Sequence, residues 1–347
     1  MKYGNFQDPI GLVARMLKSG NPAAYSSLIR EFLSIASGPI DSFLHKRENR
    51  ILKHDVRGSS LPVILIVGPP RGGTTLVYQA LASTLPVSYF NNFSALFPRS
   101  PISSSQLFNQ VWSHQNTPFD FKNYYGNTRR LSDPNDGFHV WDRWLGKNRY
   151  EPKRALSIAE KEDMKAFFQA WLAVFKQPFL NKNNRNLYCM DLLSQCLDNI
   201  YFIVVRRDPV FIAQSLFIAR QKIQGNQEIG WGLGADQLSS HQGPDAAFRS
   251  VAEQVALIYD GLHQQLQKIN SKQVIDVQYE EFCLDPNQIV AQIYDAIWSN
   301  LEVPKIQPPL IDSFDVSNQV RLSDRSFHKL QGFIQDYSIQ AVSTVGL

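Results

Sequence analysis

Residues 68–76 read Gly-Pro-Pro-Arg-Gly-Gly-Thr-Thr-Leu and combine several groups that bind phosphate. Gly72 and Gly73 let backbone N–H groups approach an anion closely, because they carry no Cβ atom. Arg71 adds a permanent positive charge and a planar set of donors for phosphate oxygens. An ordinary glycine turn would not need the arginine. The segment therefore predicts an anion-binding loop.

The same segment differs from the loop of nucleoside triphosphatases, GxxxxGK[ST], at one decisive position. Gly68 and Gly73 have the separation of the two motif glycines, but Thr74 stands where that loop has its lysine. The lysine reaches the β- and γ-phosphates, so its absence argues against an ATPase or a kinase. Thr74 and Thr75 instead offer hydroxyl donors at a helix start, which favours a ligand with fewer phosphates at this loop.

The elements around this loop are those of an α/β fold. The apolar run at residues 61–68 is short and β-branched and ends in Gly-Pro, which predicts a buried parallel strand. A helix is expected at residues 75–84, further strands at 201–205 and 273–282, and an amphipathic core helix at 246–268. This alternation predicts an α/β three-layer sandwich with a mostly parallel central sheet and a P-loop-like strand-loop-helix unit.

The strand-loop-helix VILIVGPPRGGTTL resembles the 5′-phosphosulfate-binding loop of the sulfotransferase family. It is most similar to the PRSGTTL form of tyrosylprotein-type and bacterial members, with Gly72 in place of the usual serine. The resemblance implies an enzyme that moves the sulfuryl group of 3′-phosphoadenosine 5′-phosphosulfate (PAPS) to a hydroxyl or an amine without a metal. It also implies that Arg71 offsets charge on the leaving 5′-phosphate. The residues expected to bind the donor here are Arg71, Gly72, Gly73, Thr74 and Thr75.

A second segment, IVVRRDPVFIAQSL, extends the resemblance. It is similar to the family's 3′-phosphate element, which implies that Arg207 and Ser215 bind the 3′-phosphate. Arg207 is expected at the carboxyl edge of a strand, where ligands bind in open α/β sheets. Ser215 is expected about two turns into a helix that begins at Pro209. Arg206 remains an alternative phosphate ligand, and a structural ion pair with Asp208 remains an alternative role for Arg207.

Tyr279 and a few cations near the C-terminus are the remaining candidates for the donor site. Residues 278–294 resemble the family's YExxxxxP element, which implies that Tyr279 lies near the nucleotide; a half-buried strand tyrosine is the alternative. In related enzymes a basic C-terminal loop completes the site, and Arg325 is retained as its candidate. The basic residues in that region are Arg321, Arg325 and Lys329. Arg220, one position from an arginine of some tyrosylprotein-type members, is a weaker candidate.

A hydroxyl acceptor benefits from a general base, and here the chain departs from the family pattern. Tyrosylprotein-type members carry a glutamate after the second strand, but residues 86–101 contain no Glu, Asp or His. Residues 130–146 resemble a segment with Pro-His-Glu in some bacterial sulfotransferase-like proteins, and Asp136 stands at the glutamate position. Asp136 is therefore the leading candidate for the base, with a turn or helix cap as the alternative. His139 and His114 are the other candidates.

Two stretches show little periodicity, residues 98–155 and residues 220–245. Long irregular loops in a compact enzyme are usually functional, so these stretches are expected to form the acceptor-site wall and a lid. Asp142 and Arg143 are expected to form a structural pair. Five aromatic residues line an apolar acceptor pocket or fill the core: Trp112, Trp141, Trp144, Tyr124 and Tyr125.

The composition excludes several classes of protein. The chain has 347 residues, a net charge of +4, 44% hydrophobic and 19% charged residues, which excludes a disordered chain and a coiled coil. The slight basic balance suits a local anion pocket better than a nucleic-acid surface. Three cysteines without CxxC spacing predict neither a disulfide framework nor a zinc site. No apolar run has the length of a membrane span and no signal-peptide pattern is present, so a cytoplasmic protein is expected.

The chain is expected to divide into a helical extension at residues 1–58 and a single sulfotransferase-like α/β domain at residues 59–347. Apolar residues of the extension recur at helical spacing, and they are Leu28, Phe32, Ile35, Ile40, Phe43 and Leu44. This face is expected to pack on the main domain. A membrane-surface or acceptor-binding role for the helices is the alternative.

The leading hypothesis is a PAPS-dependent sulfotransferase whose acceptor is a small molecule, a lipid or a saccharide. A homodimer is expected by resemblance alone. Two alternatives remain: a P-loop kinase of a small metabolite, which would need Mg²⁺ and ATP, and a nucleotide-binding protein of the same fold that has lost its base. The leading hypothesis requires Arg71 and Arg207 to face a single cleft, so that one nucleotide can bridge them.

Overall fold

The computed structural model describes residues 5–53, 59–112, 119–299, 301 and 307–337. A central four-stranded sheet organises them, and its strands are β4 (Phe179–Lys182), β1 (Val63–Val67), β5 (Ile200–Arg206) and β6 (Val274–Gln278), in that order across the sheet. Every neighbouring pair is parallel. The predicted α/β class with a parallel sheet is therefore confirmed.

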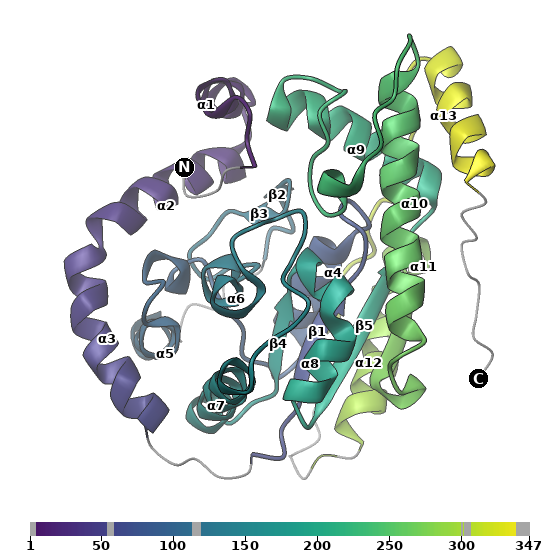
Figure 1. The fold of residues 1–347 in the computed structure, drawn as a ribbon. Coiled ribbons are helices and arrows are strands. Elements are labelled where there is room, and N and C mark those ends of the chain that lie inside the picture. The colour runs from purple at the N-terminus through teal and green to yellow at the C-terminus, as the bar shows by residue number, and fades with distance from the viewer. Residues whose placement is uncertain (1–4, 54–58, 113–118, 300, 302–306, 338–347) are drawn as a thin grey trace.

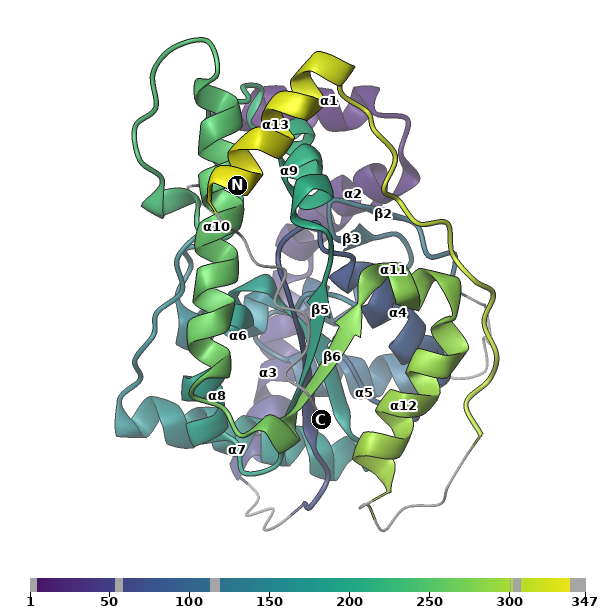
Figure 2. The same cartoon turned by 90° about the vertical axis from the view of Figure 1, so that its right-hand side faces the viewer.

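Helices cover both faces of this sheet, as Figures 1 and 2 show. Alternate residues of β1 enter two separate hydrophobic clusters, with Leu65 in one and Ile64 and Ile66 in the other. One face carries α7 (Ile158–Phe175), α8 (Met190–Cys196) and α10 (Ala246–Leu266), and the other carries α4 (Thr74–Thr84), α11 (Tyr279–Leu284) and α12 (Pro286–Trp298). The sheet is buried on both sides, which explains the unbroken apolar run of β1 and confirms the three layers.

The predicted boundaries hold for two of the three expected strands. The helix α9 (Pro209–Gln224) begins at the predicted proline, and the Asp208 side chain caps it by accepting a 2.8 Å hydrogen bond from Val210 N. The prediction of a strand over residues 273–282 is wrong in its second half, because β6 ends at Gln278 and α11 begins at Tyr279. Glu280 and Glu281 in the first turn of α11 suit the positive end of a helix.

The stretch 98–155 contains more regular structure than predicted. It holds α5 (Pro101–Trp112), the hairpin strands β2 (Asn123–Tyr124) and β3 (Asn127–Thr128), and α6 (Phe138–Leu145). The start of α5 is capped from a distant part of the chain: Glu48 accepts hydrogen bonds from Ile102 N and Ser103 N at 3.0 and 2.8 Å. No local pattern could reveal that cap. The stretch after α9 is irregular as predicted, with one short 3₁₀ turn at Ala235–Gln237.

Side chains on α6 differ from two expectations. Trp141 and Trp144 are buried in the core rather than in a pocket. Asp142 does not pair with Arg143, because adjacent residues point to different sides of a helix. Instead Arg143 pairs with Asp163 at 3.3 Å, and Asp142 pairs with Arg185 at 3.0 Å.

The N-terminal extension forms three helices in its described part, and they make an arc along one edge of the molecule (Figure 1). These helices are α1 (Pro9–Lys18), α2 (Pro22–Ala36) and α3 (Gly38–Lys53). α1 packs on α9, α2 on the β2–β3 hairpin, and α3 on α5 and α7. At the other end of the chain, α13 (Asp324–Asp336) packs on α9 and α10. The remaining short 3₁₀ turns are Ser94–Leu96, Asn184–Cys189 and Ser271–Gln273.

The face of the extension that was expected to pack on the core is mostly exposed. Leu44 is buried as predicted, but Phe32, Ile35, Ile40 and Phe43 are exposed. The prediction is wrong for these four residues because α2 packs through a different face, which carries Ala23, Ala24 and Arg30 among its buried residues.

Two searches of the described residues give negative results. Among them, no helix has the length and apolar character that crossing a bilayer requires. The same residues contain no group of three His, Cys, Asp or Glu side chains placed to hold a metal ion.

Candidate active site

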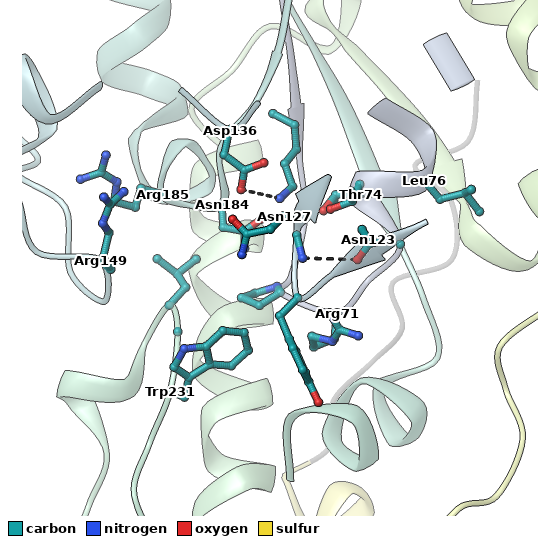
Figure 3. A pocket seen from close by; sticks show the side chains of 18 of the residues that line it. Arg71, Thr74, Leu76, Asn123, Asn127, Asp136, Arg149, Asn184, Arg185 and Trp231 are labelled. Carbon is teal, nitrogen blue, oxygen red and sulfur yellow. Dashed lines mark hydrogen bonds and ion pairs between the residues drawn. The ribbon is translucent and has the colours of Figure 1, made fainter. Parts of the chain in front are cut away.

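A cavity of about 460 Å³ opens at the carboxyl edge of the sheet, beside the loop that joins β1 to α4. Side chains from several elements point into it (Figure 3). The loop residues in its wall are Pro70, Arg71, Gly73, Thr74 and Thr75. Gly72, which was predicted with them, stays behind the wall, where its N–H donates to Pro69 O at 2.9 Å. The predicted anion-binding loop therefore borders the largest cavity found in the described residues.

Gly73 is needed for its backbone conformation and for the space that it leaves. Its φ is +91°, and a Cβ atom placed on it would lie 2.2 Å from Cδ2 of Tyr279. The Tyr279 ring therefore packs directly against the loop. The Tyr279 hydroxyl accepts a hydrogen bond from Ser317 N at 3.2 Å, and the ring also lines the cavity. Tyr279 opens α11 and is buried, so it is not the half-buried strand tyrosine considered from the sequence.

We expect Gly73→Ala to be more destabilising than an alanine at another glycine with positive φ. Gly20 is the matched control, because its φ is +66° and nothing lies within 4 Å of its added Cβ. Gly20→Ala should cost about 1–2 kcal/mol from backbone strain, and Gly73→Ala about 1–3 kcal/mol more from displacing the tyrosine ring. Urea unfolding of both variants measures the difference. Equal losses would contradict the tight packing between the loop and Tyr279.

Arg71, Ser215 and Arg207 come together on one side of the cavity. Arg71 Nε donates to Ser215 Oγ at 3.0 Å, and Arg207 Nη1 donates to the backbone oxygen of Arg71 at 2.8 Å. Arg207 Nε also donates to Asn318 Oδ1 at 3.1 Å, which fixes the plane of its guanidinium. Both arginines line the same cavity, as the sequence hypothesis requires.

The electrostatics of this side of the cavity favour an anionic ligand. Burial lowers the pKa of the Arg71 guanidinium, and the nearby charges of Arg207 and Arg321 lower it further. Burial likewise lowers the pKa of Arg207. These shifts mean that the cations are desolvated and repel one another. A bound anion would relieve both effects.

A buried ion pair faces the loop from the other side of the cavity. Lys182 is the last residue of β4 and is 2% exposed, and its Nζ lies 2.8 Å from Oδ2 of Asp136. A Cβ placed on Gly126 would lie 3.7 Å from both of these atoms and 3.9 Å from Oγ1 of Thr75. The lysine, the carboxylate and the loop hydroxyl therefore surround one point. Figure 3 shows Asp136 and Thr74 on the two sides of it.

Lys182 is the functional candidate that the sequence analysis missed. It lies beside Ile66 in the register of β4 and β1, so it ends the strand next to the one that leads into the loop. The signal was weak, because β4 contains only two apolar residues, Phe179 and Leu180, before Asn181 and Lys182. Recognising β4 as a strand would have placed Lys182 at the carboxyl edge of the sheet, where ligands bind.

Aromatic side chains form the rest of the cavity wall. They come from both stretches that were expected to border the acceptor, with Tyr125 and Phe138 from the first and Trp231 from the second. The Tyr125 ring lies under the Arg71 guanidinium, 4.8 Å from its central carbon, and against Trp231 at 5.8 Å. Tyr124, by contrast, is buried in a cluster with α1 and α2.

The N-terminal extension also contributes to the cavity, which the sequence did not predict. Asn5 and Phe6 line it. The Tyr150 hydroxyl and Gln224 Nε2 donate to the Asn5 backbone oxygen at 2.8 and 2.9 Å, which holds this segment in the wall.

The histidine and C-terminal candidates lie elsewhere. His139 lines a separate cavity of about 130 Å³ and not the large one. Arg325 is exposed on α13 and outside the large cavity, and Lys329 pairs with Asp245 at 2.6 Å. Arg321 is the nearest of the three C-terminal cations to the cavity, because it donates to Ser317 Oγ at 3.0 Å. His114 and the side chain of Trp112 fall outside the described residues.

The two alternative arginines have structural partners. Arg206 pairs with Asp276 at 2.6 Å and does not line the cavity. Arg220 is fully buried and donates to Gln254 Oε1 at 2.8 Å and to Ser250 Oγ at 3.1 Å. Neither lies with Arg71 in the cavity wall.

Comparison with known families identifies this arrangement. A family model described as "Sulfotransferase family" matches residues 62–302, which include β1, the loop, β4, β5 and β6. The chain belongs to the sulfotransferase family. It is therefore an enzyme that transfers sulfo groups, and the kinase alternative is set aside.

Solved structures of other sulfotransferases share the fold of this one. The sulfotransferase STF9 from Mycobacterium avium is 13% identical with a TM-score of 0.50, and the match covers 84% of this chain and 71% of that chain. The sulfotransferase STF1 from Mycobacterium tuberculosis H37Rv is 14% identical with a TM-score of 0.48, over 96% of this chain and 89% of that one. A search of curated proteins finds no match.

Proposed function

We propose that this sulfotransferase takes its sulfuryl group from PAPS and transfers it to a hydroxyl or amine acceptor by in-line attack. The proposal is carried by one observation: Arg71, Ser215 and Arg207 form one side of a cavity whose other side presents Lys182 and Asp136. The first group suits the phosphates of a nucleotide, and the second suits the reacting atoms.

The charge of the cavity fits a polyanionic donor. Its described lining contains five cationic side chains and one carboxylate, Asp136. The cations are Arg71, Arg149, Lys182, Arg185 and Arg207. A donor with two phosphates and a sulfate would offset this excess of positive charge.

Each part of the donor has a proposed set of partners. The N-terminus of α4, with Gly72, Gly73, Thr74 and Thr75 beside it, is proposed to bind the 5′-phosphosulfate through N–H and hydroxyl donors. Arg207 and Ser215 are proposed to bind the 3′-phosphate. The ring of Tyr279 is proposed to contact the nucleoside. Arg321 replaces Arg325 as the C-terminal candidate, because it lies nearer to the cavity.

The chemistry needs charge stabilisation and a proton acceptor. In the proposed step the acceptor oxygen bonds to sulfur while the bond between sulfur and the 5′-phosphate oxygen breaks. Arg71 and Lys182 are proposed to offset the charge that develops on the leaving phosphate and on the transferred group. Lys182 already occupies Oδ2 of Asp136, so we assign Oδ1 as the atom that takes the acceptor proton. The proposal assigns no step to a metal ion.

The acceptor is proposed to carry an apolar or aromatic body beside its hydroxyl. Tyr125, Phe138 and Trp231 would contact that body, since they form the aromatic wall of the cavity. A small molecule, a lipid and a saccharide all remain within the proposal. A cytoplasmic location is proposed as well, because the three cysteines are buried and unpaired, as in a reducing compartment.

Asp136→Asn tests the assignment of the base. The amide cannot accept the acceptor proton, so we expect kcat to fall by about 10²–10⁴, while the affinity for 3′-phosphoadenosine 5′-phosphate stays nearly unchanged. Transfer from labelled PAPS to a library of hydroxyl acceptors measures the rate. Asp198→Asn is the matched control, because Asp198 forms an exposed pair with Lys165. Transfer that survives in Asp136→Asn would leave Asp136 only the role of holding Lys182.

A further inference from the structure

The helix α2 carries its apolar residues on the side that faces away from the protein. Its buried residues are Ala23, Ala24 and Arg30, which are small or polar. Phe32 is 73% exposed and Ile35 is 71% exposed, and Ile29 is exposed beside them. A surface helix normally turns its apolar stripe toward the core. The reversed orientation of α2 therefore indicates a partner outside the described chain.

The apolar surface continues from α2 onto α3 and then becomes basic. Ile40 and Phe43 are exposed, and Phe43 is 74% exposed. The exposed residues Lys46, Arg50 and Lys53 follow Phe43 at helical spacing and lie on the same side of α3. We call these residues the outer face, and they are Ile29, Phe32, Ile35, Ile40, Phe43, Lys46, Arg50 and Lys53. Figure 1 shows that the junction of α2 and α3 lies at the outer edge of the molecule.

The acidic residues of α3 are turned inward, which leaves the outer face without negative charge from this helix. Glu48 accepts hydrogen bonds from Ile102 N and Ser103 N at the start of α5. Asp41 accepts from Arg99 N at 3.2 Å and from Ser100 Oγ at 2.8 Å. Both carboxylates are buried. The cations of α3 therefore project outward without the acids that share their helix.

We propose that the outer face binds an anionic lipid surface, with the apolar residues inserted below the headgroups and the cations paired with them. Exposed Phe and Ile beside a Lys/Arg cluster are the two features that interfacial helices use. A second copy of the chain fits less well, because a twofold contact would bring identical cations into one interface. The proposal does not depend on the identity of the sulfuryl donor.

Vesicle binding tests the proposal directly. The purified full chain is sedimented with vesicles of phosphatidylcholine alone and with vesicles of an equal mixture of phosphatidylcholine and phosphatidylglycerol. We expect binding to the mixed vesicles to be at least about tenfold stronger and to weaken in high salt, because each cation near an anionic surface contributes about a fivefold gain. Equal binding to both vesicles, or binding to neither, would overturn the proposal.

Two variants separate the apolar and the basic parts of the outer face. Phe32→Ser with Phe43→Ser should weaken binding to the mixed vesicles by roughly tenfold or more. Lys46→Glu with Arg50→Glu should weaken it by a similar factor and remove most of the salt dependence. All four side chains are exposed, and thermal unfolding confirms that each variant is folded. The charge variant tests the proposal independently of the apolar one.

The matched control moves the same kind of substitution elsewhere. Ile158 and Leu284 are also exposed, on α7 and α11, and Ile158→Ser with Leu284→Ser should leave vesicle binding unchanged. Light scattering of the wild type and of the Phe32→Ser, Phe43→Ser variant reports the oligomeric state. A wild-type dimer that becomes a monomer in that variant, without vesicle binding by either, would overturn the proposal and assign the outer face to a second copy.

Discussion

Replacing Lys182 with methionine is expected to lower the rate of sulfuryl transfer by roughly 10²–10³, with little change in donor affinity. Lys182 is buried, lies 2.8 Å from Asp136 and faces the loop that carries Arg71. Its ammonium group can therefore stabilise charge that grows only as the sulfuryl group moves. Methionine has a similar shape without the charge, so the packing at the end of β4 should be kept.

Single-turnover rates and binding of 3′-phosphoadenosine 5′-phosphate are the measurements for this variant. Lys165→Met is the control, because Lys165 forms only an exposed pair with Asp198. The double variant with Asp136→Asn adds a further test. If the two residues act as a unit, its loss should be much smaller than the product of the two single losses. A Lys182→Met enzyme with the wild-type rate would remove the lysine from the mechanism.

Arg207→Ala is expected to abolish the rise in melting temperature that 3′-phosphoadenosine 5′-phosphate produces in the wild type. A ligand that binds only the folded state stabilises it by about 2.7 kcal/mol at a hundred times its Kd. The variant should lose most of that stabilisation, because Arg207 both lines the cavity and donates to the Arg71 backbone oxygen at 2.8 Å. Arg207 is therefore expected to bind the ligand and to hold the loop.

The neighbouring arginine gives a matched control for this experiment. Arg206→Ala removes the same side chain one position away, but Arg206 pairs with Asp276 outside the cavity. It should keep the full ligand-induced shift. Melting temperatures without ligand show how far each variant is destabilised by itself. A shift that persists in Arg207→Ala, or disappears equally in Arg206→Ala, would contradict the proposed donor site.

The donor side of the cavity could be predicted from the sequence because its signals are local. A β-branched run, two glycines and an arginine are adjacent in the chain, and the loop between β1 and α4 follows from them. The register of β1 and β5 then brings Arg207 to the same edge as Arg71. Local pattern and strand order together were enough for this half of the site.

The other half could not be predicted, because it depends on contacts between distant residues. Lys182 ends a strand with only two apolar residues, and its ion pair joins it to Asp136 across the cavity. The α2 prediction failed for a related reason. Periodicity identified the apolar face correctly but cannot say which way a helix turns, and the polar contacts of Arg30 with the Thr128 and Arg129 carbonyls turn it outward.

The wall that Asn5 and Phe6 contribute has a consequence for how this enzyme can diversify. The segment before α1 borders the cavity through side chains that belong to neither the sheet nor the anion-binding loop. Substitutions there can reshape the space offered to an acceptor without disturbing the strands or the residues that are proposed to hold the donor. Choice of acceptor can thus evolve in a separable appendage, while the inherited scaffold stays constant.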